Sequence, residues 1–549
     1  MKKLITSLFA LAVMTTASAQ MSSTAQARVY AYDLKLIDNS TSYKVEFKTN
    51  TEATSAKVIV YNPEVKEETF TFEAVSLDKK MWNANILASD VNPCTKYNFK
   101  VEATADDVTE FTFLTEKTSQ FKFFRAFAVA IDNSPSSPYF GRIYVPNQGS
   151  TDTGLYTFNP QLDEKEKHVV DVIGDKTTTK GTSPRDMAIA SDGRIFVSDY
   201  TADINKTGVY CINPKDFTHN QVFQGTPTKV TAETPSTKEG EAPSTTTSYA
   251  IKNGDIYVGG RAGGIGLRGE GENIQLFVND HAKSTSEGMA NSDTNDYICR
   301  YDIGTSSTWS SAPSWSINKF APKSGKATLL ARGFNSIDVV KNGFWVSAQR
   351  GANLSTYQYT PLFYYSEKTG CREFEIVTDM PNLNHTYSSK NGGLAVNEDL
   401  GLIAYTLSYP NSSGTAEKNA YVRILSYVEK EDGTVAVEHI GDYDVSSLQS
   451  TYINALDFDY AGNLYAVSNI SEYLSVFALP TSEGGNVRET PGQGVVEFSE
   501  KGFTPTSIET IESENAPVEY YNLQGVKVEN PENGIFIKKQ GRKTTKVIL

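Results

Sequence analysis

Six polar residues stand at matching places in the sequence, at or directly before apolar runs that have the length of β-strands. They are Arg185, Asp186, Asn335, Asp338, Asn391 and Asn454. Amide and carboxylate oxygens are the hard ligands that suit Ca²⁺ or Mg²⁺, and with a guanidinium they can also hydrogen-bond a sugar or a carboxylate. Side chains so far apart in the chain act together only if the fold gathers them. The residues therefore predict a binding or metal site that depends on how the strands are arranged.

Local motifs offer no simpler site. Residues 264–269 match GxGxxG, but residues 273–278 have the pattern of another strand, where a dinucleotide site needs a helix. We interpret these glycines as a loop that runs over one face of the fold. The five histidines have neither HxH nor HExxH spacing, and the sequence contains no GxSxG elbow. Structural or solvated roles remain the alternative for the six polar residues.

A repeated hairpin pattern explains how the six residues can meet. An apolar run, a glycine turn and a second apolar run recur at residues 140–145 (a weaker copy), 186–198, 249–258, 337–346, 394–404 and 456–467. The turn glycines are 61 residues apart from Gly193 to Gly254, 58 from Gly343 to Gly401 and 61 from there to Gly462. β-Repeats of this length are typical of propeller blades, of which we predict about six, with five or seven as alternatives. In a propeller, the six polar residues converge at the mouth of the central channel.

The repeat region, residues 121–499, carries strand patterns such as Ser191-Asp192-Gly193-Arg194-Ile195-Phe196-Val197. In this it resembles the propeller superfamily that includes NHL-repeat and gluconolactonase-like proteins. The resemblance implies an architecture more than an activity. In lactonase-like members a Glu, two Asn or Asp residues and a metal ion perform the chemistry, and a complete set cannot be matched in this sequence. The chain also resembles propeller proteins that gut Bacteroidetes export.

Residues 28–118 form a first unit in front of the repeats. Alternating residues at 43–47 and 56–60 predict strands with one buried face. Residues 91–101 resemble the segment of fibronectin type III domains that holds a buried tyrosine corner, with Tyr97 as that tyrosine and Val91 in place of the usual leucine. The resemblance implies a fibronectin type III or immunoglobulin-like β-sandwich that acts as a spacer or docking module.

The N-terminus has the pattern of a secretory signal. Lys2 and Lys3 precede an apolar run, which ends in Ala17-Ser18-Ala19, so we expect residues 1–19 to be removed. No later run reaches the roughly 20 apolar residues that a membrane span needs. Without its two lysines the mature chain has a formal net charge of −16 instead of −14, which argues against nucleic acid as a partner. We predict a secreted or cell-surface protein, with the periplasm as the alternative.

The C-terminal residues 512–549 form a third unit. Tyr520-Tyr521-Asn522-Leu523-Gln524-Gly525 and Gly534-Ile535-Phe536, followed by residues 543–548, resemble the C-terminal sorting module of type IX secretion substrates. Phe536 stands where that family commonly has Tyr. The resemblance implies a small β module that the export machinery reads, which would make this machinery a partner.

The sequence as a whole predicts an all-β protein, in which an N-terminal β-sandwich is followed by a β-propeller of about six blades and a short C-terminal β tail. A disulfide between Cys211 and Cys299 is one option, and buried free thiols are the other. The favoured function is binding of a glycan or protein ligand on the propeller face. The alternatives are a metal-dependent, lactonase-like hydrolase or lyase, with Ca²⁺ or Mg²⁺ as its cofactor, and a structural envelope protein.

Overall fold

The computed structural model describes most of the chain between residues 26 and 548. The described residues are 26–149, 152–174, 184–200, 206–234, 240, 242, 244–258, 260, 262–280, 297–322, 328–329, 335–348, 362–380, 393–410, 416–445, 453–467, 473–499, 517–540 and 543–548. Their regular structure is almost entirely antiparallel β-sheet, with α3 (Ile376–Asp379) as a single helical turn. The predicted all-β class is confirmed. The predicted signal peptide, residues 1–19, lies outside the described residues.

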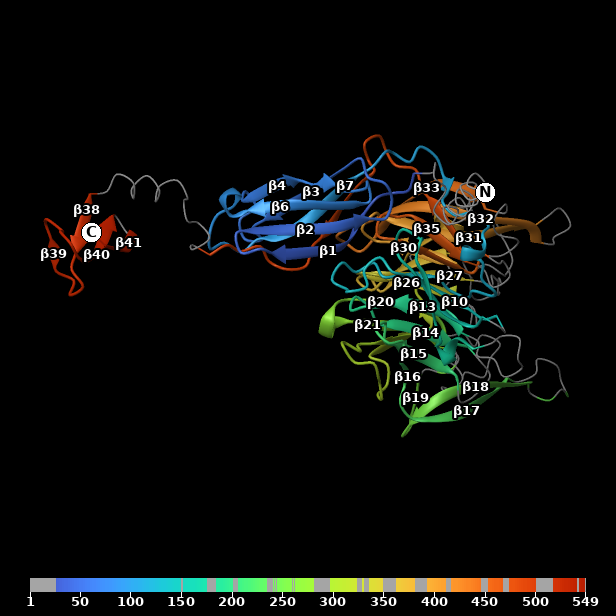
Figure 1. The fold of residues 1–549 in the computed structure, drawn as a ribbon. Helices are drawn as coiled ribbons and strands as arrows, with labels where there is room; N and C mark the ends of the chain where they lie inside the picture. The colour runs from blue at the N-terminus through green and yellow to red at the C-terminus, as the bar shows by residue number, and fades with distance from the viewer. Residues whose placement is uncertain are drawn as a thin grey trace, which may run out of the picture.

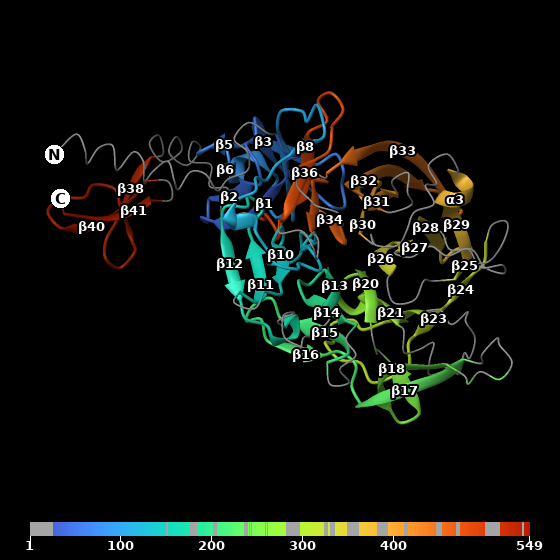
Figure 2. The same cartoon turned by 90° about the vertical axis from the view of Figure 1, so that its right-hand side faces the viewer.

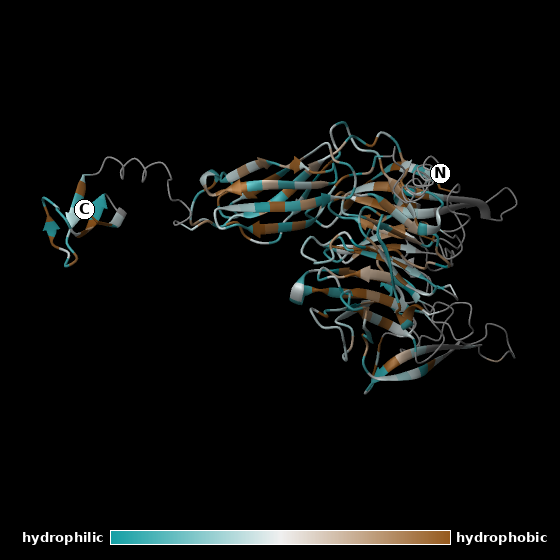
Figure 3. Ribbon diagram, viewed as in Figure 1, coloured by the Kyte–Doolittle hydropathy of each residue, from teal (hydrophilic) through white to brown (hydrophobic). Residues whose placement is uncertain are grey.

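Two four-stranded sheets, formed mainly by the first seven strands of the chain, pack face to face (Figure 1). One contains β1 (Ala31–Asp38), β2 (Ser42–Thr49), β6 (Met81–Leu87) and β5 (Val75–Ser76), and the other contains β37 (Val487–Pro491), β7 (Asn98–Thr104), β3 (Ser55–Tyr61) and β4 (Thr69–Glu73). Their strands alternate between polar and apolar residues, visible as teal and brown bands in Figure 3, and the apolar side chains form one core. Tyr97 is fully buried in it, and its hydroxyl accepts a hydrogen bond from the Asn92 N–H at 3.3 Å.

Six further four-stranded sheets follow one another around a ring (Figure 2). Blades 1 to 3 are β9 (Ala130–Ile131), β10 (Ile143–Asn147), β11 (Gly154–Phe158) and β12 (Lys165–His168); β13 (Pro184–Ile189), β14 (Ile195–Asp199), β15 (Gly208–Ile212) and β16 (His219–Gln221); and β20 (Ala262–Arg268), β21 (Gln275–Asp280), β22 (Tyr297–Tyr301) and β23 (Trp315–Ile317). Blades 4 to 6 are β26 (Asn335–Val340), β27 (Gly343–Ala348), β28 (Leu362–Ser366) and β29 (Cys371–Glu375); β30 (Leu394–Asn397), β31 (Leu402–Pro410), β32 (Ala416–Glu429) and β33 (Val435–Asp444); and β34 (Ala455–Phe458), β35 (Leu464–Val467), β36 (Ser475–Ala478) and β8 (Thr112–Phe113).

The first strand of each blade lies innermost, and each inner strand contacts that of the next blade. The contacts run from β9 through β13, β20, β26, β30 and β34 and back to β9, so the ring is closed. Sequential four-stranded sheets around a closed ring of inner strands are the architecture of a β-propeller. The propeller prediction is therefore confirmed by the strand pairing.

The third blade differs from the prediction. The hairpin at residues 249–258 belongs to a separate three-stranded sheet of β17 (Thr226–Thr234), β18 (Ser244–Asn253) and β19 (Ile256–Val258). The inner strand of blade 3 is instead β20, which contains most of the GxGxxG stretch, so the expectation of a loop there is wrong. Gly266 is needed in this strand because a Cβ atom would come within 2.5 Å of Val339 on the neighbouring blade. The sequence signal was local, and a hairpin inserted between blades has the same signal as one inside a blade.

Sandwich and propeller are interlaced. β8 pairs with β36 and so closes the last blade with a strand from the N-terminal side, while β37 returns after the last blade and pairs with β7 of the sandwich. These segments lie across the predicted boundaries at 28–118 and 121–499, because strand pairing and not chain order decides which unit a segment joins. Each of the two units thus completes one of its sheets with a strand from the other part of the chain.

Buried and partly buried side chains fill the junction between the two units. The rings of Tyr30, Phe140 and Tyr460 pack edge to face, with centroids 5.1 to 5.9 Å apart, and Tyr32 lies 6.4 Å from Tyr30. Asn486 connects three segments, because its Oδ1 accepts from the Val29 N–H and its Nδ2 donates to the carbonyls of Ala27 and Asp106. The junction is therefore a packed, hydrogen-bonded interface.

The C-terminal unit is a four-stranded sheet of β39 (Lys527–Val528), β38 (Val518–Tyr521), β40 (Ile535–Gln540) and β41 (Lys543–Ile548). No described residue of this sheet is buried. Cys211 and Cys299 are both buried thiols on strands of two different blades and are not joined by a disulfide, so the disulfide option is wrong. Within the described ranges, no helix has the length and apolar character needed to cross a bilayer.

The interlaced junction predicts that a substitution of Asn486 lowers the stability of the fold. Asn486→Ala removes three hydrogen bonds and leaves buried backbone groups unpaired, so the free energy of unfolding should fall by about 2 to 4 kcal/mol. Chemical denaturation of the mature protein measures this. Asn85→Ala, at an exposed sandwich position, is the control and should change stability by less than about 0.5 kcal/mol. Equal stability of the two variants would contradict the account of the junction.

Candidate functional site

The structure brings three of the six predicted site residues to the central channel. Asp186 on β13, Asp338 on β26 and Asn454 just before β34 line one cavity. Arg185 is not among the lining residues, although its charge interacts with that of Asp186 and burial lowers its pKa. Asn335 is the first residue of β26, and its side chain lies outside the described part of the structure. Asn391 also lies outside the described residues.

A third aspartate completes a regular arrangement around the channel. On alternate blades, one inner-strand carboxylate accepts the backbone N–H of the next blade's inner strand. Asp186 accepts from Ile265 at 3.0 Å, Asp338 from Val396 at 2.6 Å and Asp457 from Ile131 at 2.7 Å. Each also accepts the N–H of the residue that follows it, as between Asp186 and Met187 at 2.9 Å. We call Asp186, Asp338 and Asp457 the carboxylate girdle.

Burial raises the pKa of every carboxyl in the girdle. It raises the pKa of Asp186 to about 6, that of Asp338 to about 7 and that of Asp457 well above its ordinary range. Desolvation is the largest cause, and repulsion adds to it, because Asp186 raises the pKa of Asp338 and both raise that of Asp457. The hydrogen bonds from backbone N–H groups oppose these effects. The charge on one girdle carboxyl therefore affects the protonation of another across the channel.

Sequence reasoning missed Asp457, although a signal for it exists. Leu456-Asp457-Phe458 repeats the order of Ile337-Asp338-Val339, an aspartate between two apolar residues of an inner strand. The prediction used the residue directly before each inner strand, which in this blade is Asn454, three positions before Asp457. When the inner strands themselves are aligned, Asp457 occupies the position on β34 that Asp338 occupies on β26.

The cavity at the girdle has a volume of about 820 Å³. It opens among the turns that join the first two strands of the blades, since Ser191, Glu270, Lys341 and Glu398 belong to its lining. Its acidic lining residues are Asp132, Asp186, Asp338, Asp457, Glu270 and Glu398, and its basic ones are Arg268 and Lys341. The cavity is thus strongly acidic.

The few positive charges of the lining do not balance the acids. Arg268 forms an ion pair with Glu367 at 2.5 Å and donates to the Val340 carbonyl at 3.1 Å. Glu398 accepts the Lys341 N–H at 3.0 Å, and burial raises its pKa. Asp132 is fully buried beside Ser137, and burial raises its pKa to about 6. A ligand in this cavity therefore meets mainly hydrogen-bond acceptors, together with those carboxyl groups that are ionised despite their raised pKa.

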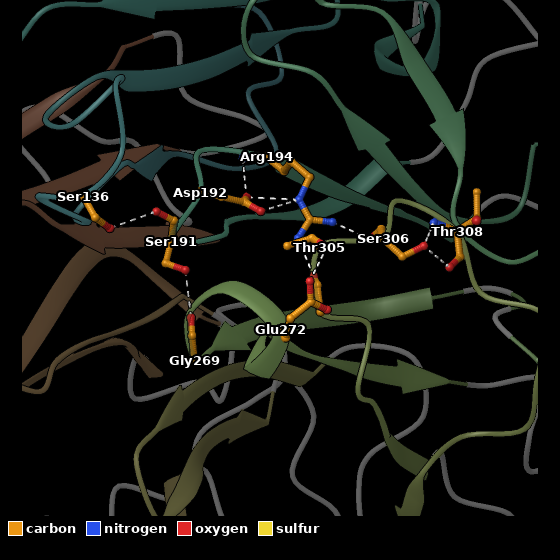
Figure 4. Close-up of polar contacts among 10 residues, drawn as sticks. Ser136, Ser191, Asp192, Arg194, Gly269, Glu272, Thr305, Ser306 and Thr308 are labelled. Carbon is orange, nitrogen blue, oxygen red and sulfur yellow. Dashed lines mark hydrogen bonds and ion pairs between the residues drawn. The ribbon is translucent and has the colours of Figure 1, made fainter.

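The turns around the cavity are fixed to one another (Figure 4). Ser191 donates to the Gly269 carbonyl at 2.9 Å, which links blade 2 to blade 3. Arg194 pairs with Asp192 at 2.8 Å and donates to the Ser306 carbonyl and, at 2.6 Å, to that of Gly304. The rim is therefore held in place before any ligand binds, which reduces the entropy that binding costs.

A metal site is not evident in the part of the chain that the structure describes. There, no three His, Cys, Asp or Glu side chains are placed so that they could hold one ion. The girdle carboxylates accept backbone N–H groups, although hard oxygen ligands were the reason to expect Ca²⁺ or Mg²⁺. The calcium or magnesium prediction gains no support from the geometry.

No protein-family model matches the sequence, and no curated protein is significantly similar to it. Among solved structures, a streptogramin B lyase has 9% identity and a TM-score of 0.30 over 67% of this chain and 97% of its own. A WD40 β-propeller domain has 10% identity and a TM-score of 0.30 over 67% and 97%. A glucose dehydrogenase has 10% identity and a TM-score of 0.29 over 68% and 99%. Likeness at this level says nothing about activity, and the propeller assignment comes from the strand pairing.

The girdle predicts how stability changes with pH. A carboxyl whose pKa is higher in the folded than in the unfolded state stabilises the fold fully below its unfolded pKa, and this contribution is lost as the pH rises through the folded value. Unfolding of the mature protein by denaturant should therefore require less free energy at about pH 8 than at about pH 5.

A substitution in the girdle separates this effect from other titrations. Asp338→Asn loses one acceptor oxygen, so it should lower the free energy of unfolding by about 1 to 3 kcal/mol at pH 5. It should also make the decrease in this free energy between pH 5 and pH 8 smaller than in the wild type. Asp255→Asn, at an exposed turn, should leave the pH profile unchanged. A wild-type pH profile in Asp338→Asn would show that the girdle does not titrate as described.

Proposed function

We propose that this protein is a binding protein, whose propeller cavity holds a glycan by its hydroxyl groups. The observation that carries the proposal is the acid-rich cavity of about 820 Å³ on a rim fixed by hydrogen bonds between blades. Its volume lies within the range of small-ligand sites. Carboxylates and carbonyls accept hydrogen bonds from sugar hydroxyls or amino groups, whereas phosphate or sulfate groups would be repelled.

Binding is favoured over catalysis by what the girdle carboxylates do. Each of them accepts two backbone N–H groups, one from its own strand and one from the neighbouring blade. A general acid or a metal ligand needs a free oxygen that faces the substrate. The metal-dependent hydrolase or lyase therefore remains the second candidate, and a basic peptide is the second class of ligand, because the cavity attracts cations.

Glu270 gives a direct test of the cavity. It is an exposed lining residue, so Glu270→Gln should weaken binding of the best ligand of a neutral and amino-sugar glycan panel by about 3- to 10-fold without loss of stability. Isothermal titration calorimetry measures the affinity. Glu438→Gln, exposed on the outer strand of blade 5, is the matched control. If only basic peptides bind, the ligand is a basic peptide and not a glycan. If neither class binds, the proposal is wrong.

We infer further that the chain is exported and that its C-terminal sheet serves as an address for the export machinery. The charged start, the apolar run and the Ala17-Ser18-Ala19 site support removal of residues 1–19. The four-stranded C-terminal sheet, in which no described residue is buried, is consistent with a unit that is recognised by another protein. The protein would then act outside the cell or on its surface.

Export can be measured in the native host. The mass of the secreted protein should show a start at Gln20. A chain that ends at residue 499 should lose surface or medium localisation and accumulate in the periplasm, while its propeller stays folded. Cell fractionation with immunoblotting reads out both results. Normal surface delivery of the shortened chain would contradict a sorting role for the C-terminal sheet.

A further inference from the structure

A second hollow lies between the sandwich and the propeller. It has a volume of about 380 Å³ and is bordered by residues from both units. The sandwich contributes Tyr32, Asp33 and Lys48, blade 1 contributes Tyr139, Arg142 and Glu164, and the segment that returns to the sandwich contributes Gln493. We call this hollow the junction cleft.

Contacts between the units fix the walls of the junction cleft. The Gln493 side chain donates from the sandwich to the Pro135 carbonyl at 3.1 Å, and the Gln161 side chain donates from the propeller to the Thr49 carbonyl at 2.9 Å. Tyr30 also packs edge to face against Phe140, with the ring centroids 5.8 Å apart. The cleft is therefore present before a ligand arrives, as is common for sites at domain junctions.

The polar groups of the cleft include one without a partner. Tyr32 is 6% exposed, and its hydroxyl is a buried polar atom with no hydrogen-bond partner among the described residues. Burial is the main cause that raises the pKa of Tyr32, and the charges of Asp33 and Glu164, which also line the cleft, raise it further, so the hydroxyl lies near the acidic wall. A buried hydroxyl without a partner costs free energy that a bound ligand can recover.

The other side chains add an aromatic surface and balanced charge. The Arg142 guanidinium lies over the Tyr139 ring at 4.7 Å, and Lys48 pairs with Asp33 at 3.4 Å. The charged lining consists of Asp33, Glu164 and Glu166 with Lys48 and Arg142, which is close to neutral in sum. Aromatic faces pack against the C–H groups of sugars, and mixed donors and acceptors match hydroxyls that can do both.

We propose that the junction cleft is a second binding site, for a neutral sugar residue. Its volume is near the lower end for ligand sites, which suits about one or two sugar rings. Pro135 borders both the junction cleft and the propeller cavity, so the two hollows lie next to each other on one face. Binding in the cleft also stabilises the contact between sandwich and propeller, because the ligand touches both units. The cleft stands independently of the function proposed for the cavity.

The test compares two tyrosines that differ only in place. Tyr32→Phe removes an unpartnered hydroxyl beside the cleft, and Tyr30→Phe removes an equally unpartnered, buried hydroxyl that does not line it. Binding of neutral mono- and disaccharides to the mature full chain is followed by saturation-transfer NMR and calorimetry. We expect Tyr32→Phe to weaken binding by about 3- to 10-fold and Tyr30→Phe to leave it unchanged. Glu164→Gln should weaken binding as well.

Hydrogen exchange separates this site from the propeller cavity. A sugar in the cleft should protect residues 134–142 and 158–166 from exchange, and should do so equally in Glu270→Gln. If no neutral sugar binds, or if Tyr32→Phe and Glu164→Gln both bind as the wild type does, the proposal is wrong. Protection confined to residues 265–275 and lost in Glu270→Gln would refute the cleft while supporting the cavity.

Discussion

Three hydrogen bonds, each between a different pair of neighbouring blades, hold the inner ring of this propeller together. Neighbouring blades form separate sheets, so the inner edges of their first strands have backbone N–H groups that no neighbouring strand pairs with. Asp186, Asp338 and Asp457 accept three of these groups from the adjacent blades. Carboxylates can do this because they have two oxygens, one for the local strand and one for the neighbour. The acidic character of the channel follows from this structural task.

The rest of the molecule is built around that ring. Strand β8 closes the last blade, and β37 ties the chain beyond the last blade to the sandwich, so neither unit consists of one continuous segment. The cavity and the junction cleft lie on the side where the turns between the first two strands of each blade gather. Hydrogen bonds from those turns to the neighbouring blade, such as that from Asn133 to the Phe458 carbonyl, keep this face in place. A face that is held in place and has two adjoining hollows suits ligand binding better than catalysis that requires movement.

Much of the fold could be predicted from the sequence, because blade hairpins have a local signal. The hairpins at residues 186–198, 337–346, 394–404 and 456–467 match inner strand pairs of the structure. The third blade was misplaced because β20 is rich in glycine and lacks the alternation of an ordinary strand. The roles of β8 and β37 depend on pairing between distant segments, for which the sequence has no local signal. At the site, Asp186, Asp338 and Asn454 were found, whereas Asp457 needed the repeats to be aligned strand by strand.

The cavity bounded by the girdle is the place where the ligand should bind. A crystal structure of the mature protein with its tightest-binding glycan tests this most directly. We expect sugar hydroxyls within hydrogen-bonding distance of Glu270 and Glu398, with the bonds from the girdle to the neighbouring blades intact. A glycan bound on the outer strands of the blades, with the cavity empty, would contradict this role of the cavity.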